Sequence, residues 1–100
     1  KGVSERLFGI IVDSTLPRRV AEAALASDDA LDMSNWHTCN TTHCLAGWAI
    51  HLNGPAGYAL EAATSPSVAG AMLMPSACHL FNASNDEARQ WCREQLKVTA

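Results

Sequence analysis

The sequence predicts an all-α domain: a compact bundle of about five short helices, with a short strand as an alternative for the first segment. Three observations lead to this prediction. Apolar residues recur at helical spacing in several stretches, capping residues, glycine or proline bound most of them, and 48% of the 100 residues are apolar while 17% are charged. This balance suits one small domain covering residues 1–100.

Features of the whole chain argue against nucleic-acid and membrane partners. The formal net charge is −3, and the basic residues are scattered with only Arg18 and Arg19 adjacent, so there is no basic stripe. No apolar run approaches the roughly 20 residues that span a bilayer. We expect a cytoplasmic bacterial protein rather than a secreted one, and the Lys1-Gly2 start suggests a domain cut from a longer chain.

The first segment is ambiguous, whereas the second is helical. Ser4 can cap a short helix, yet the apolar run at 7–12 fits a short buried strand equally well. We predict a helix over 16–27, because Pro17 suits a first turn and apolar residues follow at helical spacing. The apolar residues are Val20, Ala23, Ala24 and Leu25.

A polar connection at 28–40 leads to the clearest helical stretch. Thr41 or Thr42 can cap this helix, and Cys44 then falls in its first turn. An Asn-Gly-Pro sequence at 53–55 gives a C-terminal stop. The apolar stripe consists of Leu45, Trp48, Ala49 and Leu52.

Three further helices follow from their start and stop signals. The first covers about 55–63, and the second begins at Ser65, which a proline follows, and ends before Pro75. The last opens with a capping box between Ser84 and Glu87. Its apolar face consists of Ala88, Trp91, Cys92 and Leu96.

The stretch 36–48, here called the corner, concentrates reactive residue types. It reads Trp-His-Thr-Cys-Asn-Thr-Thr-His-Cys-Leu-Ala-Gly-Trp and holds two of the four cysteines, two of the four histidines and two of the three tryptophans. Cysteine and histidine bind transition metals, act as nucleophiles or form crosslinks. The corner is therefore where we expect a functional site.

The corner, together with residues 31–35, resembles a family of uncharacterised short bacterial and phage domains. Its signature is Trp-His-Thr-Cys-x-Thr-Thr-His-Cys-x-Ala-Gly-Trp. The resemblance runs from about Val20 to Leu96, is dense only at 36–48, and implies a bacterial or phage origin but no activity. Family members often carry arginine after the second cysteine of the signature, where this chain has Leu45, so a cation at that position has no counterpart here.

One interpretation of the corner is a structural zinc site, zinc being the one cofactor that the sequence suggests. Two histidines and two cysteines fall between His37 and Cys44. Adjacent residues of a helical turn point about 100° apart, so His43 and Cys44 cannot easily reach one ion. The favoured ligand set is His37, Cys39 and Cys44, completed by Cys78, His79 or Cys92.

A second interpretation is a disulfide or redox pair between Cys39 and Cys44. Four intervening residues allow a turn to bring their Cα atoms within the roughly 4.4–6.8 Å that a bridge needs. The positive end of a helix dipole would lower the pKa of Cys44, which makes it the attacking thiol of the pair.

A third interpretation is a thiol-dependent enzyme. Cys44 would be the nucleophile, His37 the general base and Cys39 the resolving thiol. No motif supplies an orienting Asn or Asp, and a chain of this length leaves little room for a substrate groove.

The fourth interpretation is a packed loop–helix corner that the small domain needs for its fold. Reduced cysteine behaves as a small hydrophobe, and Trp36 and Trp48 are then core residues. We favour this interpretation. It predicts an interaction or accessory module rather than an enzyme, with another protein or a neighbouring domain of the same chain as its partner.

Overall fold

The fold is predominantly helical, with two pairs of short strands that make the all-α prediction approximate. The computed structural model describes residues 6–7, 10–11 and 13–97, with side chains from residue 13 onward. Its elements are β1 (Arg6–Leu7), β2 (Ile10–Ile11), α1 (Leu16–Ala24), β3 (His37–Cys39), β4 (Thr42–His43), α2 (Leu45–Leu52), α3 (Gly54–Ala63), α4 (Pro66–Leu73), the 3-10 helix η1 (Pro75–Leu80) and α5 (Asn85–Lys97).

The first segment forms two short strands where the single strand at 7–12 was predicted, since β1 and β2 pair antiparallel with Leu7 opposite Ile10. The helix alternative depended on Ser4, which lies outside the described residues. Helix α1 begins at Leu16 as predicted and ends at Ala24, three residues before the predicted end at 27. The 3-10 helix η1 was not predicted.

The capping signals of the later helices are confirmed. The Ser65 hydroxyl accepts a hydrogen bond from the Val68 amide at 3.2 Å and starts α4. At α5 the capping box is complete, because Ser84 Oγ accepts from the Glu87 amide at 3.2 Å and Glu87 Oε1 accepts from the Ser84 amide at 3.0 Å.

The predicted start of α2 is wrong. Thr42 belongs to strand β4, and the helix begins at Leu45 with Cys44 as its N-cap. The Cys44 sulfur accepts from the Gly47 amide at 3.3 Å, which satisfies a free N–H of the first turn. Strands β3 and β4 form a tight antiparallel hairpin with a register shift between His37 and Cys39.

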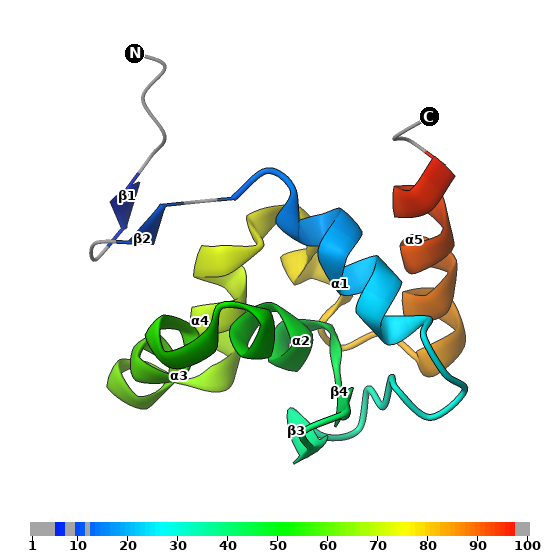
Figure 1. The fold of residues 1–100 in the computed structure, drawn as a ribbon, viewed down its shortest axis with the longest axis horizontal. Helices are drawn as coiled ribbons and strands as arrows, with labels where there is room; N and C mark the ends of the chain where they lie inside the picture. Colours follow the sequence, from blue (N-terminus) through cyan, green and yellow to red (C-terminus); the bar gives the residue numbers. More distant parts are fainter. Residues whose placement is uncertain (1–5, 8–9, 12, 98–100) are drawn as a thin grey trace.

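Helix α2 is the centre of the core (Figure 1). Residues Leu45 to Ile50 are all buried, because α1, α3 and α4 pack around this helix. Helix α5 packs against α1, and the β3–β4 hairpin continues directly into α2. No helix in the described part of the chain is long and apolar enough to cross a membrane.

Candidate functional site

Backbone contacts fix the hairpin to the loop that follows α1. The His43 amide donates to the Ala30 carbonyl at 3.2 Å, and the Asp32 amide donates to the His43 carbonyl at 3.1 Å. The indole N–H of Trp48 also donates to the Ala30 carbonyl, at 2.8 Å, and is buried. A buried helix side chain and strand β4 therefore hold the same loop carbonyl.

The corner packs closely against the first turn of α2. A Cβ atom at Gly47 would overlap the Trp36 carbonyl oxygen and lie 2.9 Å from its carbon. The Cys44 thiol lies 3.8 Å from the same oxygen and is 2% exposed. Only glycine at 47 allows the loop to approach the helix this closely.

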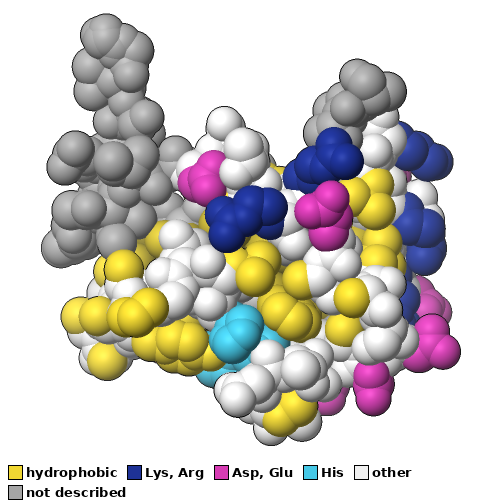
Figure 2. All heavy atoms as spheres, viewed as in Figure 1, with side chains coloured by type: hydrophobic (Ala, Val, Ile, Leu, Met, Phe, Trp, Pro, Cys, Tyr) yellow, Lys and Arg dark blue, Asp and Glu magenta, His cyan; other side chains and the backbone are white. Residues whose placement is uncertain are grey.

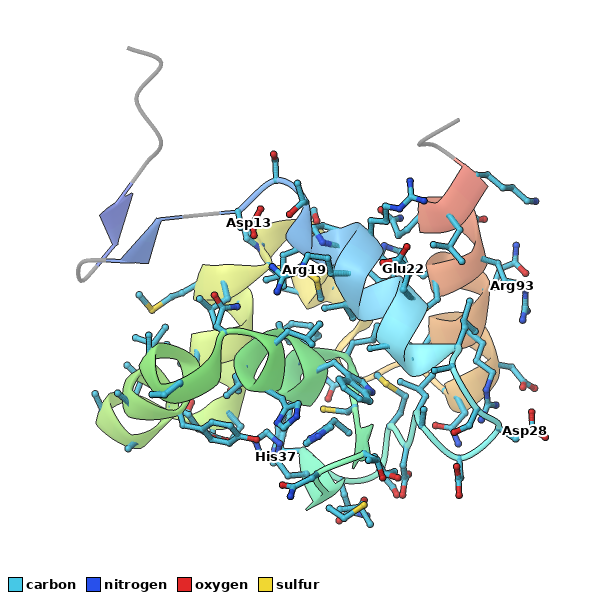
Figure 3. The ribbon with its side chains drawn as sticks, in the orientation of Figure 1. Asp13, Arg19, Glu22, Asp28, His37 and Arg93 are labelled. Atoms are coloured by element: carbon cyan, nitrogen blue, oxygen red, sulfur yellow. The ribbon has the colours of Figure 1, made fainter. Side chains whose placement is uncertain are left out.

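A chain of hydrogen bonds runs from α3 through the hairpin, and we call it the histidine chain. His37 Nε2 lies 2.9 Å from Glu61 Oε2, and His37 Nδ1 lies 2.8 Å from His43 Nδ1. His43 Nε2 then lies 3.1 Å from the Asn40 carbonyl oxygen. In Figure 3 the labelled His37 lies where the hairpin meets α2 and α3.

Aromatic side chains surround the histidine chain. His43 stacks on His51 with 4.5 Å between ring centroids and contacts the edge of Trp48 at 4.6 Å. His51 Nδ1 in turn lies 2.8 Å from the Tyr58 hydroxyl. Figure 2 shows histidine side chains at the surface of this face, beside hydrophobic side chains over α2 and α3.

Comparisons with protein-family models, with curated proteins and with solved structures found no match.

The two histidines differ in their electrostatic environment. His43 is 1% exposed, and its burial lowers its pKa below the ordinary 6.5 and outweighs the hydrogen bond with the Asn40 carbonyl, which raises it. His51 and His37 lower the pKa of His43 further, and Glu61 raises it. His37 is partly exposed and faces the Glu61 carboxylate. Burial therefore disfavours a positive charge on His43, whereas a carboxylate lies beside His37.

The prediction that the helix dipole lowers the pKa of Cys44 is wrong. Burial raises the pKa of this thiol above 9.0 and outweighs the opposing backbone N–H groups of the first turn. Cys39 is instead the acidic thiol of the corner. It is exposed, and hydrogen bonds with Thr41 and Thr42 lower its pKa to about 7.

Cys39 and Cys44 are free thiols in the structure, and their sulfurs have different partners. The Cys39 sulfur lies 3.4 Å from the Thr41 hydroxyl, whereas the Cys44 sulfur contacts Gly47 and Trp36. The disulfide is not formed here and stays a prediction. His37, the predicted base, is bonded to His43 and Glu61 rather than to Cys44.

The predicted zinc ligands are not assembled. Among the described residues, no group of three or more His, Cys, Asp or Glu side chains is arranged to hold a metal ion. Cys78 is exposed on η1, and Cys92 is buried on α5. The zinc interpretation therefore draws no support from this arrangement.

Sequence reasoning found His37 and His43 but missed Glu61, His51 and Tyr58. The missed residues lie on α2 and α3, outside the dense stretch at 36–48, so the clustering of Cys and His gave no reason to include them. A weak signal was present: Tyr58 and Glu61 are three residues apart and so share a helix face.

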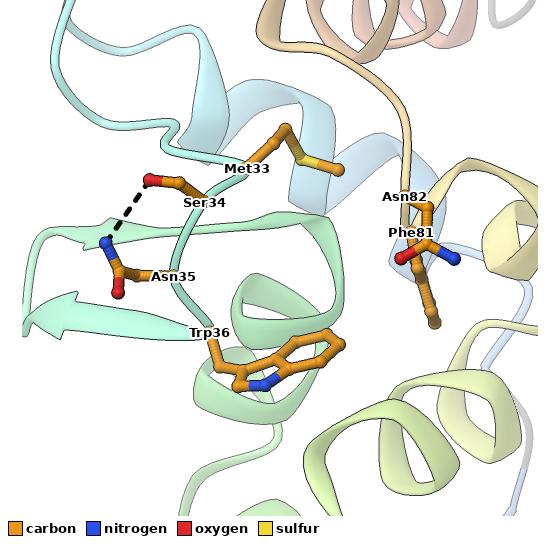
Figure 4. Close-up of a pocket in the computed structure, with 6 residues that line it drawn as sticks. All are labelled: Met33, Ser34, Asn35, Trp36, Phe81 and Asn82. Carbon is orange, nitrogen blue, oxygen red and sulfur yellow. Dashed lines mark hydrogen bonds between the residues drawn. The ribbon is translucent and has the colours of Figure 1, made fainter.

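A groove lies beside the corner, between the loop at 32–36 and the turn at 81–85. One part, of about 210 Å³, is lined by Met33, Ser34, Asn35, Trp36, Phe81 and Asn82. The adjoining part, of about 320 Å³, is lined by Asp32, Met33, Ser34, Ala83, Ser84 and Asn85. In Figure 4 Trp36 lies on one side of the first part, and Phe81 and Asn82 lie on the other.

Proposed function

We propose that this domain is an interaction module that binds a segment of another protein, or of a neighbouring domain of its own chain, in the groove beside Trp36. The observation that carries the proposal is the exposed indole. Trp36 was expected in the core, yet it is 38% exposed and forms one wall of the groove. Tryptophan is enriched among the residues that dominate binding energy at protein interfaces.

The groove has well-anchored walls. The Met33 amide donates to Asn85 Oδ1 at 2.7 Å, which joins the loop to the start of α5 across the groove. The Trp36 backbone is packed against Gly47 and Cys44 of the corner. A groove with fixed walls loses little conformational freedom when a ligand binds.

The charge of the groove suggests the chemistry of its partner. Of the side chains that line its two parts, Asp32 alone is charged. Hydrogen bonds from the Ser34 hydroxyl and amide lower the pKa of Asp32, so it is a carboxylate at neutral pH. A carboxylate next to an exposed indole suits a Lys or Arg beside an apolar residue.

The thiol-enzyme alternative is less well supported than the interaction module. Cys44 is buried with a raised pKa, and both ring nitrogens of His37 are already hydrogen bonded. The bacterial or phage origin implied by the family resemblance is compatible with either function.

The proposal is tested by selecting a phage-displayed random peptide library on the folded domain. We expect peptides with a Lys or Arg beside an apolar residue, and we expect Trp36→Ala to weaken their binding by about 30-fold or more, as for an interface hot spot. Asp32→Asn should weaken the binding and reduce its salt dependence.

Val68→Ala is the matched control, because Val68 is 46% exposed on α4 and does not line the groove. The binding of the selected peptides should be unchanged in this variant. Peptides that bind equally well to Trp36→Ala, or a library that gives no specific binder, would reject the groove as the binding surface.

A further inference from the structure

The three contacts of the histidine chain need a fixed number of hydrogens on the two imidazole rings. The Asn40 carbonyl only accepts, so His43 Nε2 must carry a hydrogen, and His37 Nε2 must carry one to donate to the Glu61 carboxylate. A third hydrogen must lie between the two Nδ1 atoms. Two neutral imidazoles carry two hydrogens in all, so the three contacts are complete only when the pair holds one extra proton.

This extra proton leaves the chain with no net charge. One imidazolium on His37 balances the Glu61 carboxylate, and His43 stays neutral in its buried position. A proton moved from His37 to Glu61 would leave the net charge of the chain unchanged. A neutral, fully hydrogen-bonded unit is the arrangement that partly buried ionisable groups need.

Among the titratable groups that face the chain, His51 lowers the pKa of His43 and Glu61 raises it, and the lowering by burial is larger than either. From α2, the His51 ring stacks on His43, and from α3 the Tyr58 ring lies 5.3 Å from the His37 ring. Glu61 is the carboxylate in the chain, and Asp32 contacts His43 through its backbone amide while its carboxylate bonds Ser34.

A change of one proton in either direction breaks a contact. A second proton places two N–H groups against each other across the 2.8 Å between the Nδ1 atoms and makes both rings cationic. Loss of the first proton leaves two lone pairs facing each other or leaves one of the outer acceptors without a donor. The contact between the His37 and His43 rings therefore forms only when the pair holds one extra proton.

We propose that the histidine chain is a proton-dependent latch that holds β3 against β4 beside α3, closed while it holds one extra proton and opened at the contact between the two rings when acidification adds a second. Trp36 directly precedes His37, so opening the latch also loosens one wall of the groove. The latch rests on the hydrogen-bond geometry and does not require the groove to bind a peptide.

The direction of the pH dependence follows from His43. In the closed hairpin its pKa is lowered by burial, and in the open hairpin it returns towards 6.5. At pH values between the lowered pKa of closed His43 and 6.5, His43 binds a proton in the open hairpin but not in the closed one. Each unit by which the pH falls below 6.5 should therefore raise the opening equilibrium of the hairpin about tenfold, until the pKa of closed His43 is reached.

The test is a pH series of imidazole ¹⁵N shifts and backbone amide exchange on the labelled protein, from about pH 7 to about pH 5, across the ordinary histidine pKa. At the upper end we expect neutral His43 with hydrogen on Nε2, and His37 with hydrogen on both nitrogens. On acidification, the amides of β3 and β4 should lose protection before those of α1 and α5. A neutral His37 at the upper end, or hairpin protection that does not change as His43 titrates, would overturn the proposal.

Variants distinguish opening of the latch from a general effect of acid on the stability of the domain. Glu61→Gln keeps an acceptor but removes the charge that balances His37, so the hairpin should already be more open at neutral pH. Glu94→Gln on the exposed face of α5 and His79→Gln on η1 should behave like the unchanged protein. Equal behaviour of Glu61→Gln and Glu94→Gln would contradict the latch.

A metal control completes the test. The pH profile should be the same with and without EDTA, because a proton rather than a metal ion joins the two rings. A profile that EDTA abolishes would overturn the latch. Loss of peptide binding with an intact pH profile would reject the groove alone.

Discussion

At the scale of single residues, Gly47 and Cys44 determine how closely the corner approaches α2. Gly47 leaves room for the Trp36 carbonyl, and Cys44 caps the helix through its sulfur. Sequence reasoning placed Cys44 near the helix start, favoured a packed role for it and left a reactive role open, because the pattern shows position and not burial. Its 2% exposure comes from tertiary packing that no local pattern reports.

We predict that Gly47→Ala destabilises the domain by about 2 kcal/mol or more, because overlap with the Trp36 carbonyl outweighs the roughly 1 kcal/mol that Ala favours a helix over Gly. Urea unfolding measures the effect. Gly54→Ala is the comparison, since Gly54 has open space around it and a φ of 61°. That change should cost only about 1 kcal/mol. Equal stability of Gly47→Ala and the unchanged protein would contradict the close approach.

At the scale of elements, the sequence predicts helices better than it predicts the hairpin. Ser65 and Ser84 act as caps because their signals are local and involve residues three apart. The β3–β4 hairpin was missed because Thr41 and Thr42 suit a helix cap as well as a turn. The contact of His37 with Glu61 joins residues 24 positions apart, which periodicity cannot reveal.

We predict that Ser84→Ala destabilises α5 by about 1 kcal/mol at neutral pH, the usual cost of losing an N-cap. Hydrogen bonds from Ser84 lower the pKa of Glu87 below 4.5. The stability that they give is present above 4.5 and is lost as the pH falls through the lowered pKa of folded Glu87. The difference between variant and parent should therefore shrink in acid, as measured by urea unfolding at several pH values. Ser76→Ala, at an exposed position of η1, should show neither effect.

At the scale of the whole molecule, the helices pack around one core, and a thiol is accessible only where it lies outside this core. Cys44 and Cys92 are buried in this core, at the N-cap of α2 and on α5, whereas Cys39 and Cys78 are exposed. Apolar spacing, capping residues and composition together predicted a helical domain, and the described part of the chain is predominantly helical. Composition could not predict which two cysteines face solvent, since all four lie beside apolar residues or turns.

The corner is a packed structural element in which the Cys44 sulfur caps α2, and we propose that Cys44 has no role as a nucleophile. The most direct test is the rate at which each cysteine of the folded protein reacts with iodoacetamide near neutral pH, read by mass spectrometry. We predict that Cys39, with its pKa of about 7, reacts first and Cys78 next. Cys44 and Cys92, whose pKa values are raised by burial, should react only as the protein unfolds. A Cys44 that reacts as fast as Cys39 in the folded protein would contradict the account.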